Sequence, residues 1–200
     1  LHLGMSGSLR IANNDDNYFL KHDHVEFLFE NEKIIYNDPR RFGSIHLTAD
    51  IDKHRLINHL GPEPLSKDFN SKYLLALCSK SKTNIKTLLM NQKNVVGIGN
   101  IYASETLYLS KVNPSKDSSK LTIADCKKVV SSSKKILNSA IKVGGTTLKD
   151  FYSADGSPGY FKFKLNVYGR EDLDCKKCKT KITKTNINKR ATYYCSSCQS

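Results

Sequence analysis

The chain has 200 residues, of which 38% are hydrophobic, so it can build one large domain or two small ones. The sequence contains no run of about 18 apolar residues, which excludes a transmembrane helix. Lys and Arg number 32 against 19 Asp and Glu, and the formal net charge of +13 is spread along the chain. A folded domain with this excess most often faces a polyanion such as nucleic acid; the alternative is a lysine-rich solvated surface.

The first 50 residues predict strands and turns. Residues 24–38, HVEFLFENEKIIYND, alternate apolar and polar side chains on either side of a turn at 30–32 and predict a hairpin. A turn at Asp38-Pro39 precedes a further predicted strand that begins at Ser44. The polar residues 13–17 predict a loop, and the opening LHLGMSG is predicted to lie inside a strand.

Residues 67–142 predict helices. Apolar residues recur at helical spacing in four segments: 71–80, 83–92, 100–111 and 122–142. Thr83 and Thr122 stand where N-caps belong. Gly97 and Gly99 suit tight turns that reverse the chain between the second and third helices. The glycines at 144–145 predict the end of the fourth helix, and a loop at 153–159 precedes a strand-like segment at 161–169.

Two C-x-x-C pairs predict a metal site near the end of the chain. Sixteen residues, 179–194, separate the pairs and alternate like a two-stranded hairpin. Four thiolates at this spacing can surround one Zn²⁺ as a tetrahedron and leave no open coordination position, so the zinc is predicted to be structural. The alternative is a pair of redox dithiols. The predicted ligands are Cys175, Cys178, Cys195 and Cys198.

The other two cysteines and the basic residues of the predicted hairpin lead to two further predictions. Cys78 and Cys126 stand alone within helical patterns and are predicted to be ordinary buried thiols of a protein in a reducing compartment. The predicted hairpin carries no acidic residue and five basic ones, which favours contact with nucleic acid over a purely structural ribbon. The basic residues are Lys179, Lys181, Lys184, Lys189 and Arg190.

Nine motifs occur in one order along essentially the whole chain. They are HLGMSG (2–7), KHDHV (21–25), DPRRFG (38–43), GPEPL (61–65), VGIGNIYASE (96–105), GGTTLKDF (144–151), PGYF (158–161), VYGR (167–170) and the cysteine pairs. Each motif alone is weak, but the ordered set closely resembles the bacterial-type formamidopyrimidine-DNA glycosylases, which repair 8-oxoguanine.

The resemblance implies an α+β fold with a β-sandwich domain, a helix-two-turn-helix domain and a zinc-finger hairpin. The implied parts are the remainder of the N-terminal β-sandwich catalytic domain at 1–60, a linker at 61–66, the helix-two-turn-helix domain at 67–152, a lesion-recognition loop with a connecting strand at 153–170, and the zinc finger at 171–200.

The resemblance also implies a function in base-excision repair. Such a glycosylase and lyase removes oxidised purines, namely 8-oxoguanine and formamidopyrimidines, from double-stranded DNA and nicks the abasic site by β,δ-elimination. It implies one structural Zn²⁺, no membrane partner, a monomeric state and a cytoplasmic, nucleoid-associated location of bacterial type.

The implied site residues fall into three groups. Arg190 is the catalytic residue, linked to the elimination step through the phosphate beside the lesion. DNA contacts map onto His22, Arg40, Lys82 and Asn100, with Lys86 as a weaker candidate, and Asn100 is expected to cap the third helix. The void left by the flipped base is filled by Met5, Arg40 and Phe42.

The family's nucleophile is an N-terminal proline, assisted by a lysine upstream of HLGMSG. This sequence begins at Leu1 and its prolines are internal, which predicts an N-terminally incomplete copy that binds DNA without catalysis. Two alternatives stay open: a non-catalytic module that binds damaged DNA, and an endonuclease VIII-like glycosylase for oxidised pyrimidines.

Overall fold

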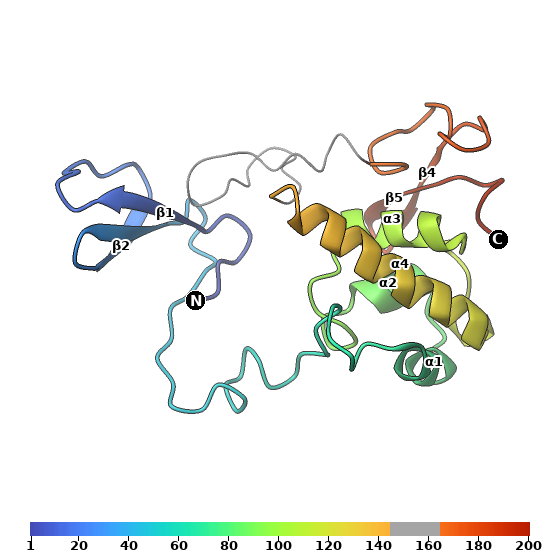
Figure 1. The fold of residues 1–200 in the computed structure, drawn as a ribbon, viewed down its shortest axis with the longest axis horizontal. Coiled ribbons are helices and arrows are strands. Elements are labelled where there is room, and N and C mark those ends of the chain that lie inside the picture. Colours follow the sequence, from blue (N-terminus) through green and yellow to red (C-terminus); the bar gives the residue numbers. More distant parts are fainter. Residues whose placement is uncertain (145–164) are drawn as a thin grey trace. The chain divides into compact units, whose positions relative to one another are not determined.

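The computed structural model describes residues 1–144 and 165–200, which form two units (Figure 1). Residues 1–50 with 140–144 belong to the first unit, and residues 51–139 with 165–200 belong to the second. Residues 61–66, the predicted linker, lie in the second unit, where Gly61 N donates a 2.8 Å hydrogen bond to Gln92 O. Most of the predicted lesion-recognition loop lies outside the described residues. No helix of the described part is long and apolar enough to cross a membrane.

The first unit contains a three-stranded antiparallel sheet in the order β1-β3-β2. Its strands are β1 (Ser8–Asn13), β2 (Asp23–Leu28) and β3 (Glu32–Asn37). The β2–β3 hairpin confirms the strand pair predicted within 24–38. Ile34 lies opposite Ile11 and Phe27, and these side chains share one face because paired residues of a sheet point to the same side. The described residues of this unit contain one sheet, so the β-sandwich stays a prediction.

Two strand predictions in this unit were wrong. The opening residues do not lie inside a strand but turn at 4–6, and His2 and Ser44 form a single isolated bridge in place of a strand from Ser44. Gly4 has a φ of +62°, and a Cβ there would lie 2.7 Å from the carbonyl carbon of Phe42. A glycine is therefore required where the first turn packs against residues 42–43, and this close packing replaces strand pairing.

The second unit contains the four predicted helices and a short 3-10 helix. They are α1 (Ser71–Ser79), α2 (Ile85–Met90), α3 (Asn100–Ser110), η1 (Ser118–Lys120) and α4 (Ile123–Ile141). Their apolar sides meet in one core, in which Leu74, Leu89, Leu107 and Val129 are buried. Cys78 and Cys126 lie in the same core as free thiols, as predicted.

The capping predictions were right for α4 and wrong for α2. Thr122 Oγ1 accepts a hydrogen bond from Asp125 N, and the Asp125 carboxylate accepts one from Thr122 N, which together form a capping box. Helix α2 is capped by Asn84, whose Oδ1 accepts from Thr87 N. The hydroxyl group of Thr83 instead pairs with Ser81 Oγ, so it is not available to the helix.

The predicted hairpin near the end of the chain is present in the second unit. Strand β4 (Thr183–Ile187) pairs with β5 (Arg190–Tyr194) in an antiparallel register. The two residues of its turn, Asn188 and Lys189, both have positive φ, 49° and 60°, as a turn that matches the twist of a hairpin requires. Residues 165–169, the described end of the segment predicted to be strand-like, form bends and turns instead.

Candidate functional site

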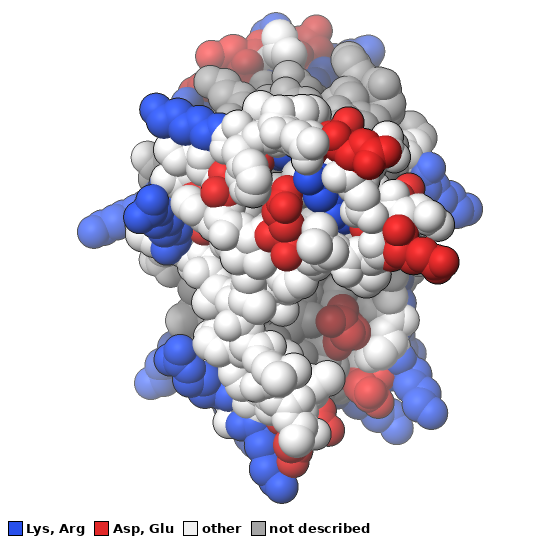
Figure 2. All heavy atoms as spheres, turned by 90° about the vertical axis from the view of Figure 1, so that its left-hand side faces the viewer, with Lys and Arg blue, Asp and Glu red and all other residues white. Residues whose placement is uncertain are grey.

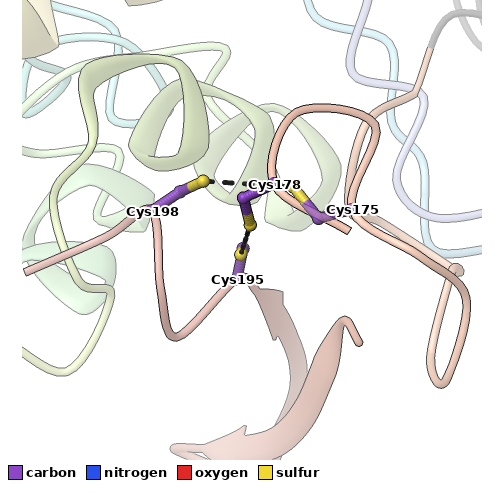
Figure 3. Close-up of side chains that lie close together, drawn as sticks. All are labelled: Cys175, Cys178, Cys195 and Cys198. Atoms are coloured by element: carbon purple, nitrogen blue, oxygen red, sulfur yellow. Dashed lines mark hydrogen bonds between the residues drawn. The ribbon is translucent and has the colours of Figure 1, made fainter. Parts of the chain in front are cut away.

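Four cysteines converge beside the β4–β5 hairpin (Figure 3). Their sulfur atoms all lie within 4.8 Å of one another, with 3.4 Å between Cys178 and Cys195 and 4.0 Å between Cys175 and Cys198. A tetrahedron of thiolates about 2.3 Å from a zinc ion has edges of about 3.8 Å, so this donor set fits a tetrahedral metal ion. Four protein ligands would leave no position for a substrate on a metal ion held there.

The hairpin is fixed to the helices by side chains of α2 and α3. Lys86 Nζ donates to Thr192 Oγ1 at 2.7 Å and to Ala191 O at 3.1 Å. The side-chain amide of Asn100 donates to the same Ala191 carbonyl at 3.0 Å. Both helices thus hold the backbone of the residue that follows Arg190, while Arg190 itself is exposed.

Lys86 lies inside the protein rather than on the surface. The residue is 1% exposed, and its ammonium group contacts strand β5. Burial lowers the pKa of Lys86 to about 8, and repulsion from Arg190 adds to the shift. In the structure this lysine connects α2 to the hairpin, and its predicted phosphate contact stays a prediction.

A pocket of about 290 Å³ lies between α2 and the tip of the hairpin. Arg190 and Lys86 contribute to its lining, together with Met90 of α2 and Asn188 of the turn. Asn188 Nδ2 also donates to Thr87 Oγ1 at 3.0 Å, which adds a further link between the turn and α2. The exposed Arg190 thus stands at the edge of this pocket.

Asn100 is the first residue of α3 and not its cap, which corrects the sequence prediction. Gly99 occupies the N-cap position and makes no side-chain hydrogen bond. The Asn100 amide is turned toward the hairpin, and its Oδ1 is buried without a hydrogen-bond partner among the described residues. Gly97, in the turn before this helix, has a φ of +72°, as the predicted reversal of direction requires.

The buried carboxylate of Asp38 organises the loops of the first unit. It accepts hydrogen bonds from Ser6 Oγ at 2.6 Å, Tyr36 Oη at 2.9 Å and Gly43 N at 2.8 Å. The hydrogen bond from Ser6, assisted by the others, holds the pKa of the Asp38 carboxyl well below its usual range. Arg40 N lies between Ser6 Oγ and Asp38 Oδ1, at 3.2 and 3.3 Å. The carboxylate therefore joins the opening turn to residues 40–43.

Around this carboxylate the structure brings Met5, Arg40 and Phe42 together. Arg40 Nη2 donates to Met5 O at 3.2 Å, and the Arg40 guanidinium carbon lies 5.8 Å from the centroid of the Phe42 ring. Met5 is 73% exposed and Phe42 is 61% exposed. The Arg40 guanidinium is thus held by the Met5 backbone and lies near the Phe42 ring, and the Met5 and Phe42 side chains are exposed on the surface.

The other predicted DNA contacts lie on the surface of the two units. His22, in the first unit, is half-buried with a φ of 77°, and its carbonyl accepts a hydrogen bond from Asp38 N. Lys82, in the second unit, is exposed in the loop before α2. Figure 2 shows Lys and Arg beside Asp and Glu on the face that it draws, so the net charge does not form one uniform basic face there.

Two buried carboxylates, one in each unit, were missed by sequence reasoning. One is Asp38; the other is Glu105 of α3, which is fully buried. Glu105 accepts from the backbone N–H groups of Asn166, Val167 and Tyr168 at 2.8–3.0 Å. These N–H groups point at the carboxylate, which is why residues 165–169 do not pair as a strand. An acid within the apolar stretch NIYASETLYL was the available signal.

Two family models and two relatives that match this chain all belong to one family of proteins. The family model for the formamidopyrimidine-DNA glycosylase N-terminal domain matches residues 1–45, and the model for the H2TH domain of the same enzymes matches residues 60–152. The chain is 49% identical over 201 residues to the formamidopyrimidine-DNA glycosylase of Hydrogenovibrio crunogenus, covering all of the chain and 71% of that protein. It is 50% identical over 200 residues to an Escherichia coli enzyme of the same name, covering all of the chain and 74% of that protein.

Solved structures of a third relative are also similar. The Lactococcus lactis enzyme in complex with an abasic-site DNA has a TM-score of 0.88 and 36% identity, over 99% of this chain and 73% of that one. A mutant of the same enzyme with a Fapy-dG containing DNA gives the same values.

Proposed function

Because the chain belongs to the formamidopyrimidine-DNA glycosylase family, a family of base-excision repair enzymes, we propose that it forms the DNA-binding part of an enzyme that acts on oxidised purines in double-stranded DNA, with the amine nucleophile supplied by the N-terminal proline that this family uses. The proposed reaction releases 8-oxoguanine or a formamidopyrimidine and then nicks the abasic site by β,δ-elimination. The observation that carries this proposal is the surface cluster of Met5, Arg40 and Phe42, held on the Asp38 carboxylate.

This cluster suits the void that a flipped base leaves in the duplex. The exposed Met5 thioether and the Phe42 ring are apolar wedges of the kind that enter between base steps. The Arg40 guanidinium lies beside them and can donate to the acceptors of the unpaired base on the other strand. The hydrogen bonds to Asp38 and to the Met5 carbonyl fix the backbone of both loops, so little ordering would be needed on binding.

Five residues are proposed to contact DNA phosphates. In the second unit these are Lys82, Asn100 and Arg190, and in the first unit they are His22 and Arg40. Arg190 is exposed on a hairpin whose backbone is fixed, and its planar guanidinium can hold two phosphate oxygens at once. Asn100 begins a helix, whose N-terminal N–H groups favour an anion. Lys86 is proposed to support this contact through β5.

The metal in the four-cysteine site is proposed to be Zn²⁺. Sulfur ligands in a closed tetrahedral arrangement are typical of structural zinc, which contributes folding free energy when bound. Cys195 directly follows strand β5, which begins at Arg190. The metal site would therefore stabilise the far end of the strand that presents the proposed catalytic residue.

Excision from three duplexes tests the function. We expect release of 8-oxoguanine to exceed release of thymine glycol, with an undamaged duplex left intact; the reverse order would favour an endonuclease VIII-like enzyme. Borohydride traps a Schiff base between an amine nucleophile and the sugar. Tight binding to the 8-oxoguanine duplex with neither release nor a trapped adduct would support a non-catalytic damage-binding module instead.

The role of Arg190 is tested by Arg190→Ala against Lys189→Ala, which removes the same charge from the neighbouring exposed position. We expect Arg190→Ala to reduce strand cleavage more than base release, and to lower the slope of log affinity against log salt by about 1. Equal loss of both steps would contradict a role in elimination.

A further inference from the structure

Helix α4 carries a row of lysines on its solvent side. Lys128 and Lys135 are exposed and seven residues apart, and Lys142 follows at the same interval directly after the helix. Seven residues make almost two full turns of an α-helix, so the three side chains lie along one side about 10 Å apart. Between them stand the exposed polar residues Ser131 and Asn138. We name these five positions the α4 lysine row.

No acidic side chain interrupts this row. The only acidic residue of α4 is Asp125, in its first turn. Its carboxylate accepts a hydrogen bond from Thr122 N at 3.2 Å and pairs with Lys116 at 3.8 Å. Lys128 lies close enough to Asp125 to help lower the pKa of that carboxyl, so the charge of the row is partly compensated at its first lysine. Lys135 and Lys142 form no ion pair with a carboxylate of the described residues.

Within the second unit, the row lies apart from the hairpin that carries Arg190. The opposite side of α4, with Cys126, Val129 and Leu137, is buried in the core. The hairpin that carries Arg190 is held by α2 and α3. Figure 1 shows α4 crossing the second unit in front of α3, with β4 and β5 drawn behind. A ligand of the row would thus meet a surface separate from Arg190.

Regular spacing and length distinguish this row from scattered surface lysines. Its three ammonium groups span about 21 Å of helix axis. One strand of duplex DNA carries a phosphate about every 3.4 Å of its axis, so the row runs beside about six phosphates. Lysine is a flexible point charge that meets phosphates without reading bases.

We propose that the α4 lysine row binds the backbone of a second DNA duplex while the lesion duplex occupies the surface of the second unit that carries Arg190. The inference rests on the proposed function for the nature of the first ligand. A protein that holds two duplexes at once can pass from one segment to the other without entering free solution. Its contact with the second duplex would be independent of sequence and sensitive to salt.

The test uses Lys128→Gln/Lys135→Gln/Lys142→Gln in the protein saturated with a short duplex that contains an abasic-site analogue. Capture of a second, undamaged and differently labelled duplex is measured over a range of salt concentrations. We expect capture by the variant to fall at least tenfold, and the slope of log affinity against log salt for the second duplex to fall by about 2 to 3. Affinity for the abasic duplex should stay within twofold.

The matched control is Lys67→Gln/Lys72→Gln/Lys80→Gln, which removes the same charge from exposed positions in and beside α1. It should retain capture. Equal loss in both variants, unchanged capture by the α4 variant, or no capture by the wild-type protein would each overturn the proposal. Failure of the wild-type protein to bind the abasic duplex would instead count against the proposed function. In that case the affinities of the two variants for undamaged duplex would still decide the role of the row, because only the α4 variant should bind it more weakly.

Discussion

The ammonium group of Lys86 and the hydroxyl group of Thr192 are joined by a 2.7 Å hydrogen bond across 106 positions of sequence. This bond ties helix α2 to strand β5, one residue from the backbone that Asn100 also holds. The exposed Arg190 at the start of the strand therefore takes its place from the helices and not from the hairpin alone.

The free energy of unfolding should depend on pH through Lys86. Burial lowers its pKa to about 8 from the ordinary 10.5. Between these values the unfolded chain keeps a proton that the folded protein releases, so the free energy of unfolding rises with pH in this window. Urea unfolding of the wild-type protein and of Lys86→Met is measured at intervals between about pH 7 and pH 10. As the pH rises, the free energy of unfolding of the wild type should increase relative to that of Lys86→Met. For Lys82→Met, which changes an exposed lysine, the difference in free energy of unfolding from the wild type should not change with pH. The same result for Lys86→Met would contradict a pH dependence that arises from Lys86.

Glu105→Gln should destabilise the second unit. The carboxylate accepts three backbone N–H groups and the Asn166 side-chain amide, and a glutamine would turn an NH₂ group toward some of these donors. We expect a loss of about 2 to 3 kcal/mol in the free energy of unfolding. Denaturant unfolding measures it, and Glu63→Gln, at an exposed position, serves as the control. A loss no larger than that of the control would show that these hydrogen bonds add little.

Phe42→Ala should affect DNA more than folding. The ring is 61% exposed, so the free energy of unfolding should change by no more than about 0.5 kcal/mol. If the ring stacks on bases beside the void, the affinity for a duplex with an abasic-site analogue should fall about tenfold. Leu47→Ala, in the same unit and fully exposed, should leave both quantities unchanged. Equal affinities of Phe42→Ala and the wild type would remove the ring from the interface.

Asp38→Asn should disturb the cluster of Met5, Arg40 and Phe42 because it removes hydrogen bonds that hold their loops. The amide would present N–H groups where the carboxylate accepts from Ser6 and Gly43. We expect a lower melting temperature together with weaker binding to the abasic duplex. Asp15→Asn, at an exposed position of the same unit, should preserve both. Normal binding by Asp38→Asn would show that the cluster does not depend on this carboxylate.

The contribution of Asp38 to the free energy of unfolding should decrease at low pH. Because the pKa of Asp38 in the folded protein lies below its ordinary value of 3.8, its stabilising contribution is complete above that value and is lost as the pH falls below it. Asp38→Asn should therefore lose less stability than the wild type during acid titration.

Cys195→Ser should lose the metal ion and DNA binding together. Removal of one of four ligands should weaken metal binding more than the 10- to 100-fold typical of changes to groups that only support a ligand. Metal analysis and affinity for the abasic duplex are measured in parallel with Cys126→Ser, which changes a buried thiol outside the cluster and should keep the metal. Full DNA affinity after removal of the metal by a chelator would break the proposed link between the metal and the hairpin.

Much of the fold follows from local patterns. The four helices, the β2–β3 hairpin and the hairpin before Cys195 were predicted because side-chain periodicity acts over neighbouring residues. The N-cap position of Thr122 was predicted, and its hydrogen bonds lie within four residues. At α2 the choice between Thr83 and Asn84 depended on a competing hydrogen bond to Ser81. The strand predicted from Ser44 failed because packing against Gly4 replaced strand pairing.

By itself, the sequence determined the four helices, the two hairpins, the cysteine spacing that fits a metal ion and the ordered motifs of the glycosylase family. Only the tertiary structure decided which side chains meet. Met5 and Arg40 are 35 positions apart, and Glu105 and Val167 are 62 apart. Nothing in the local pattern placed Lys86 in the interior, because its burial depends on hydrogen-bond acceptors that another part of the chain brings to it. Contacts of this length are set by packing of the whole unit, and they place Lys86, which was predicted to contact phosphate, against strand β5.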